Sequence, residues 1–147
     1  MKIAHDTLVM VADGEKLLLF RNEGDEKYPV LETLAHEETS HAATHEQGSD
    51  RPGRSHASVG ERRSGYGQTD WHEQGEQRFA RHAAETLDRA ARRADGDIVL
   101  VAAPRVLGVM RKVLPSDVAN RIIAQIPKDL ARHETDDVVE AISAHQS

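Results

Sequence analysis

Two apolar runs separated by Asp13-Gly14 constrain the fold of this chain more than any other feature of its sequence. The runs extend from Thr7 to Ala12 and from Glu15 to Asn22, and each is long enough for one strand. Asp-Gly is a pair that type I′ turns prefer, because both central residues of that turn have positive φ. The segment therefore predicts a β-hairpin in which Met10 lies opposite Leu17. Apolar residues occupy both alternating positions of each run, so we expect both faces of the hairpin to be covered.

The region after the hairpin predicts a third strand and then a long polar insertion. The third strand is expected from Tyr28 to Ala35, and Pro29 near its start suits the edge of a sheet, because proline has no N–H to donate. From His36 to His72 the chain has no Leu, Ile, Met or Phe, but it holds five of the nine His and five of the ten Gly. Such a composition cannot bury enough apolar surface to offset the entropy of ordering the chain. We therefore expect residues 36–72 to form a flexible polar insertion loop.

Apolar residues return at helical spacing after this insertion. Asp70-Trp71-His72-Glu73 fits a capping box, with Trp71 interpreted as a hydrophobic staple that packs the helix start. The apolar stripe that follows consists of Phe79, Ala80, Ala83, Ala84, Leu87, Ala90, Ala91 and Ala94. Because most of these side chains are alanine, the helix is expected to lie close to a sheet. Asp95-Gly96 is expected to end it.

The second half of the chain predicts two more strands and two more helices. Ile98 to Ala102 is continuously apolar, which is typical of a parallel strand that is buried on both faces. A short helix is expected from Arg105 to Leu114 and a terminal helix from Thr135 to His145. Arg121 to Ile126 alternates in a way that predicts a strand, with a helix starting at Asp117 as the alternative.

The expected order is therefore β-β-β-α-β-α-β-α, with the long polar loop between the third strand and the first helix. Three antiparallel strands followed by two strands that arrive through helical crossovers form an α/β fold with a ribonuclease H-like mixed five-stranded sheet. A length of 147 residues suits one domain, over residues 1–147.

A nuclease of this fold would hold two metal ions with an acid inside the first strand and another at the end of the fourth. Here the first strand has Val9 and Met10 at its middle, and the fourth ends in Ala102-Ala103-Pro104. The fold by itself does not imply the activity. The sequence therefore argues against a two-metal nuclease.

Composition narrows the functional classes further. The formal net charge of -6 argues against a general affinity for phosphate backbones, which requires clustered cations. The absence of cysteine excludes disulfides, thiol nucleophiles and thiolate zinc sites. The longest apolar runs fall far short of the roughly 20 residues of a membrane span, and the start of the chain is unlike a secretory signal. We expect a cytoplasmic protein without a cofactor or membrane contact.

One local cationic cluster lies inside the expected insertion. Arg51, Arg54, Arg62 and Arg63 precede the aromatic residues Tyr66 and Trp71. The arginines could bind RNA phosphates or an acidic partner while the rings stack on bases. Six acidic residues outnumber the four arginines between residues 36 and 72, so a solvated loop is the alternative interpretation.

Histidines are also frequent in this segment. His36, His41 and His45 lie near glutamates and could in principle ligate zinc or nickel. No third ligand occurs at a firm spacing, so we interpret them as solvated polar residues and expect no metal site.

Several short segments resemble the bacterial host attachment protein family, whose name comes from a requirement for attachment to host cells. The resemblance spans nearly the whole chain. It rests on Val11-Ala12-Asp13-Gly14, Leu19-Phe20, Arg51-Pro52-Gly53-Arg54-Ser55, Arg78-Phe79-Ala80, the run from Val99 to Gly108 with Arg111, and Ile126-Pro127-Lys128-Asp129-Leu130.

That family looks like the middle domain of archaeal and eukaryotic peptide-chain release factors, which shares this sheet and inserts a Gly-Gly-Gln peptide before its long helix. Gly65-Tyr66-Gly67-Gln68 occupies the corresponding place here. The tripeptide reads Tyr-Gly-Gln, and Gln68 lies farther ahead of Arg78 than in the release factors. The resemblance implies an RNA-contacting or partner-binding role for Tyr66, Gly67 and Gln68, although Tyr66 lacks the backbone freedom of glycine.

Three functional hypotheses follow. The first is a non-enzymatic binding or regulatory protein of the host attachment family, which acts on attachment indirectly through an unknown protein partner or through gene expression. The second is a ribosome-associated, release-factor-like protein that contacts RNA or peptidyl-tRNA through residues 51–68. The third, which the sequence favours least, is a metal-dependent hydrolase.

Overall fold

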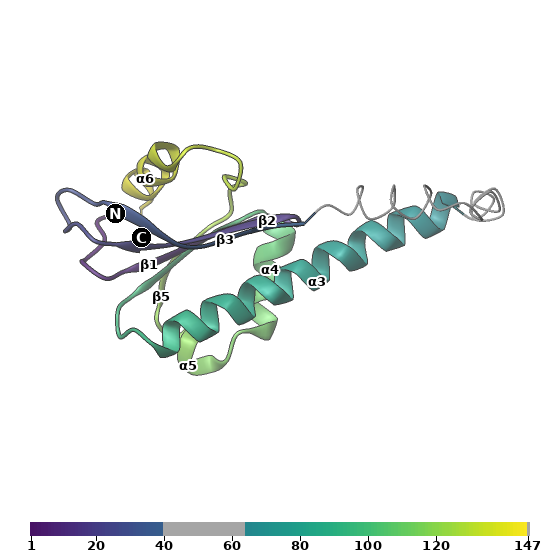
Figure 1. Ribbon diagram of the computed structural model, residues 1–147, viewed down its shortest axis with the longest axis horizontal. Helices are drawn as coiled ribbons and strands as arrows, with labels where there is room; N and C mark the ends of the chain where they lie inside the picture. Colours follow the sequence, from purple (N-terminus) through teal and green to yellow (C-terminus); the bar gives the residue numbers. More distant parts are fainter. Residues whose placement is uncertain (40–63, 147) are drawn as a thin grey trace.

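A computed structural model describes residues 1–39 and 64–146, with side chains from residue 73 onward in the second range. Its strands are β1 Leu8–Ala12, β2 Lys16–Asn22, β3 Leu31–Glu38, β4 Ile98–Ala102 and β5 Ile122–Ile126. Its helices in the described range are α3 Ser64–Arg92, α4 Pro104–Val113, α5 Ser116–Ala119 and α6 Thr135–Ala144. Figure 1 shows their arrangement.

The five strands form one mixed sheet in the order β3-β2-β1-β4-β5. β1 pairs antiparallel with β2, and β2 pairs antiparallel with β3. β4 is parallel to both β1 and β5, and the crossover that a parallel pair requires runs through α4 and α5 between β4 and β5. This confirms the expected α/β fold with its ribonuclease H-like strand order. β5 is a strand as predicted, and the competing helix is confined to the four residues of α5.

Helices cover both faces of the sheet (Figure 1). α3, α4 and α5 lie on one face, where Met10 and Leu100 belong to the same buried cluster as Leu87. α6 lies on the other face, where Val9 belongs to a second buried cluster with Val138. Because neighbouring residues of a strand point to opposite faces, β1 and β4 supply both clusters and are buried along their whole length.

The hairpin turn differs from the predicted type I′ turn. No glycine in the described ranges has positive φ. Instead, the Asp13 Oδ1 atom accepts hydrogen bonds from the backbone N–H groups of Glu15 and Lys16, each at 2.7 Å. This aspartate-capped loop is longer, so Met10 lies opposite Leu19 and not Leu17. A shift of two residues keeps every side chain on its expected face.

The predicted boundaries of the third strand and of the polar insertion are also wrong. β3 begins at Leu31 because the Asn22 and Asp25 side chains bind the preceding backbone N–H groups, including those of Tyr28 and Val30. It continues to Glu38, since an edge strand tolerates exposed polar side chains.

At the other end, α3 begins at Ser64, ahead of the predicted start at Asp70. Residues 36–38 and 64–72 therefore belong to regular elements, and residues 40–63 lie outside the described ranges.

No helix in the described part of the chain is both long enough and apolar enough to cross a membrane.

Candidate functional site

A cleft lies at the end of the sheet where β1 and β4 both terminate. Ala12 pairs with Ala102, so the loops that follow these two strands begin side by side. They enclose a cavity of about 530 Å³. Its lining consists of Asp13, Gly14, Glu15, Glu76, Ala103, Pro104, Arg105, Val106 and Asp129. In α/β sheets, ligands commonly bind at the carboxyl ends of adjacent strands, which makes this edge the first candidate site.

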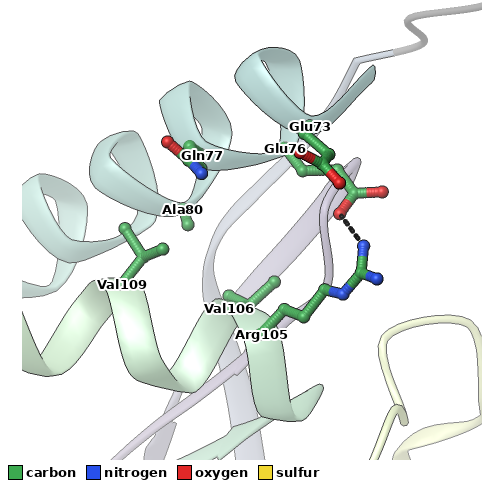
Figure 2. Close-up of a pocket in the computed structure, with 7 residues that line it drawn as sticks. All are labelled: Glu73, Glu76, Gln77, Ala80, Arg105, Val106 and Val109. Carbon is green, nitrogen blue, oxygen red and sulfur yellow. Dashed lines mark ion pairs between the residues drawn. The ribbon is translucent and has the colours of Figure 1, made fainter. Parts of the chain in front are cut away.

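A second hollow of about 350 Å³ adjoins the first, between α3 and α4. Figure 2 shows the seven residues that line it, namely Glu73, Glu76, Gln77, Ala80, Arg105, Val106 and Val109. Glu76, Arg105 and Val106 line both hollows, so the two hollows meet there. Arg105 reaches from α4 toward α3, with its Nη1 atom 3.9 Å from Oε2 of Glu76. Its side chain is 78% exposed, so most of the guanidinium faces solvent.

Gly14 allows α3 to approach the hairpin loop. A Cβ atom at residue 14 would lie 2.6 Å from Cγ of Glu76 and 3.2 Å from its Cβ. The glycine is therefore required here by close approach, and not by the positive φ that the turn prediction assumed.

Arg132 holds the carboxylates on the other side of the cleft. Its guanidinium lies 3.8 Å from Asp13, 3.3 Å from Glu15 and 3.7 Å from Glu38. Asp13 is nearly buried and already caps the hairpin loop. These carboxylates therefore serve the local structure. Within the described ranges, no group of three or more His, Asp or Glu side chains is placed to hold a metal ion.

Glu37 and His82 link β3 to α3 near the same edge. The His82 Nε2 atom lies 2.8 Å from Oε1 of Glu37, and both side chains are partly exposed. Glu37 and Glu38, two of the glutamates that lie near His36 in the sequence, are thus engaged by His82 and Arg132. His36 lies in β3, while His41 and His45 fall outside the described residues.

The site residues predicted from the sequence fall into two groups. Arg51, Arg54, Arg62 and Arg63 lie outside the described residues, so the structure places none of them. Tyr66, Gly67, Gln68 and Trp71 lie in the first turns of α3, of which the backbone is described. The structure therefore gives no side-chain contact within either group.

The start of α3 projects from the body of the protein. The helix has 29 residues, which corresponds to a length of about 43 Å. Among the residues from Glu73 onward, Gly75 is the first buried one, and it lies about 16 Å along the helix from Ser64. Figure 1 shows α3 extending well past the edge of the sheet. The Tyr-Gly-Gln peptide is thus carried on a helical extension next to the cleft.

The sequence interpretation missed Glu76, Arg105 and Arg132 as cleft residues. Arg105 could have been found, because it follows Pro104 directly after a buried parallel strand, where ligand-binding loops are frequent. Glu76 and Arg132 come from α3 and from the segment before α6, and nothing in the sequence joins these two segments.

We expect Gly14→Ala to lower the free energy of unfolding by about 1 kcal/mol, because the new methyl group overlaps the Glu76 side chain. In a Glu76→Ala background most of this cost should vanish, because the Glu76 Cγ and Cδ atoms that the new methyl group would overlap are absent. Urea unfolding of the two single variants and the double variant gives the coupling. The effect of alanine on the unfolded chain cancels in this cycle. Equal costs in both backgrounds would contradict the proposed overlap.

A family model described as Bacterial archaeo-eukaryotic release factor family 12 matches residues 6–142 of the chain. The match runs from just before β1 to the last turn of α6 and so covers the cleft and the projecting helix. None of the curated proteins matches the chain. The family match supports the release-factor part of the resemblance, and it does not bear on attachment to host cells.

Proposed function

Because the chain belongs to bacterial archaeo-eukaryotic release factor family 12, we propose that it is a ribosome-associated protein that contacts RNA through the start of α3 and residues 51–68. The observation that carries this proposal is the position of Tyr66-Gly67-Gln68 in the first turns of a helix that extends past the sheet. A peptide at that position can enter a narrow RNA-lined space while the domain stays outside it.

Each residue of the proposed contact has a chemical role. Arg51, Arg54, Arg62 and Arg63 supply cations for phosphate oxygens. Tyr66 and Trp71 supply rings that can stack on unpaired bases. Gly67 allows the backbone to come close to RNA, and the Gln68 amide can donate and accept hydrogen bonds.

The proposal assigns binding and not hydrolysis of peptidyl-tRNA. A Gly-Gly-Gln peptide relies on the conformational freedom of both glycines, and Tyr66 removes that freedom at the first position. Close approach to an ester would also have to accommodate the bulk of the Tyr66 side chain.

Arg62→Ala/Arg63→Ala is expected to weaken co-sedimentation with purified ribosomes at low salt by about tenfold, because two phosphate contacts are lost. The matched control is Lys2→Ala/Lys27→Ala, which removes the same charge from exposed residues at the opposite end of the sheet. The control should sediment like the unchanged protein.

A protein that stays at the top of the gradient at low salt, or an arginine variant that sediments normally, would refute the proposed contact. The hypothesis of an indirect role in attachment to host cells, through a protein partner, would then be the one to pursue.

A further inference from the structure

The charges of this acidic protein are unevenly distributed over its surface. Eight cations and only two acids lie in one region, which consists of α3 from Arg78 onward, the adjoining Arg93 and α4. This region has a net charge of +6, whereas the whole chain has a net charge of -6. The cations are Arg78, Arg81, Arg89, Arg92, Arg93, Arg105, Arg111 and Lys112, and the acids are Glu85 and Asp88. The rest of the chain therefore has a net charge of -12. Both helices cover the same face of the sheet (Figure 1).

The arginines of α3 form a stripe along one exposed face of the helix, which Glu85 shares between Arg81 and Arg89. Arg78, Arg81, Arg89 and Arg92 recur at helical spacing and are all exposed, as is Arg93. The opposite side of the helix is buried against the sheet. From Arg78 to Arg93 the stripe is about 22 Å long. α4 packs against α3 and adds the exposed residues Arg105 and Lys112. Arg111, also in α4, instead donates a hydrogen bond to Gln125 of β5.

Several of these cations are not neutralised by neighbours. Arg92 pairs with Asp88 and Asp117, and the hydrogen bond from Arg92 lowers the pKa of the Asp117 carboxyl below its usual value. In the described ranges, Arg81, Arg93 and Lys112 form no ion pair, and neither does Arg89. The stripe therefore keeps most of its positive charge.

Helix stability does not account for all of these residues. Cations in the last turn of a helix interact favourably with its dipole, which explains Arg89, Arg92, Arg111 and Lys112. Arg81 lies three turns before the end of α3, and Arg105 lies in the first turn of α4, where a positive charge is disfavoured. Arg105 has Glu76 as a partner within the domain, at 3.9 Å. A bound partner with negative charge would explain Arg81.

We propose that this surface, which we call the arginine face (Arg78, Arg81, Arg89, Arg93, Arg105 and Lys112), binds the phosphate backbone of double-stranded RNA along α3. This rests on the proposed function and extends the RNA contact from the helix tip to the body of the domain. Residues 78–92 of α3 and all of α4 contain one Phe, Tyr or Trp, which is Phe79. Phe79 is buried, so this face has no exposed aromatic ring on which bases could stack. Contacts to the backbone alone suit a duplex and do not depend on its sequence.

The test is binding of the full-length protein to a short RNA duplex, measured by fluorescence anisotropy over a range of salt concentrations. Arg81→Ala/Arg89→Ala/Arg93→Ala should bind about 30-fold more weakly than the unchanged protein at low salt. The slope of log affinity against log salt should become shallower by about two to three. The control Lys2→Ala/Lys27→Ala/Lys128→Ala removes the same charge from exposed residues elsewhere and should change binding by less than about threefold.

The outcomes separate this inference from the proposed function. Equal duplex binding by the arginine variant and the control would overturn the arginine face, even if ribosome binding still depended on Arg62 and Arg63. If the arginine variant loses duplex binding but the unchanged protein does not co-sediment with ribosomes, the arginine face is supported and the ribosomal role is rejected. The inference would be overturned if the unchanged protein did not bind the duplex. It would also be overturned if the triple arginine variant lost binding to anionic phospholipid vesicles but not to RNA.

Discussion

Replacing Asn22 with alanine is expected to lower the free energy of unfolding by about 3 kcal/mol, because one fully buried amide satisfies five backbone groups. The Nδ2 group donates to the carbonyl oxygens of Ile3 at 3.2 Å, Ala4 at 3.1 Å and Asp25 at 3.4 Å. The Oδ1 atom accepts from the N–H groups of residues 24 and 30 at 3.0 and 2.9 Å. Asn22 thus joins the N-terminal segment to the turn between β2 and β3.

Urea unfolding of Asn22→Ala measures this cost. Asn22→Asp is an informative second variant, because a carboxylate would face the carbonyl oxygens of Ile3 and Ala4 without a donor and should be at least as destabilising. Asn120→Ala changes an exposed asparagine and should cost less than about 0.5 kcal/mol. A loss below about 1 kcal/mol for Asn22→Ala would mean that water replaces the amide, contrary to its complete burial.

Leu100→Ala is expected to lower the free energy of unfolding by about 3 kcal/mol, through lost apolar burial and the cavity left behind. Leu100 is fully buried in β4, where it lies between Met10 of β1 and Gln125 of β5. Its side chain belongs to the cluster that packs under α3 and α4. Because the surrounding strands are fixed by backbone pairing, the site can collapse only partly.

Ile123→Ala is the matched control for Leu100→Ala. Ile123 lies in β5, the neighbouring strand, and is 39% exposed. Its replacement should cost less than about 1 kcal/mol. Thermal or urea unfolding of both variants compares the two positions, and similar losses would show that β4 is not the centre of the core.

The strands could be predicted because their apolar runs are long and uninterrupted. Leu8–Ala12 and Ile98–Ala102 are buried on both faces, and residues of this kind leave few alternatives to a central strand. The turn type could not be predicted, because Asp-Gly suits more than one loop and here the Asp13 carboxylate selects the longer one. The ends of the polar insertion were placed wrongly because an edge strand and a projecting helix need no apolar stripe.

Residues of the cleft and of the arginine face are brought together by tertiary structure. Glu76 and Arg105 are far apart in the sequence and meet only because α3 and α4 pack on the same face of the sheet. Net charge concealed the arginine face, since the value for the whole chain is negative. The sequence points to Tyr66, Gly67 and Gln68, and their RNA-contacting role stays a prediction.

Together, the projecting start of α3 and the positive face of α3 and α4 suggest one mode of binding. The helix would lie along RNA with its N-terminal turns directed farthest from the sheet. The opposite face of the protein, covered by α6, carries Asp136, Asp137 and Glu140 and would be repelled by phosphate. In this orientation, a ribosome would slow amide exchange on the side of α3 and leave the side of α6 unchanged.

Amide hydrogen exchange of the full-length protein, with and without purified ribosomes, tests the ribosomal role most directly. The turns of α3 from Ser64 to His72 belong to the part of the helix that extends past the sheet (Figure 1), and we expect them to exchange quickly in the free protein. On addition of ribosomes at low salt, we predict slower exchange in these turns, with α6 unchanged. Exchange that is the same with and without ribosomes, or protection confined to α6, would contradict an RNA contact through the start of α3.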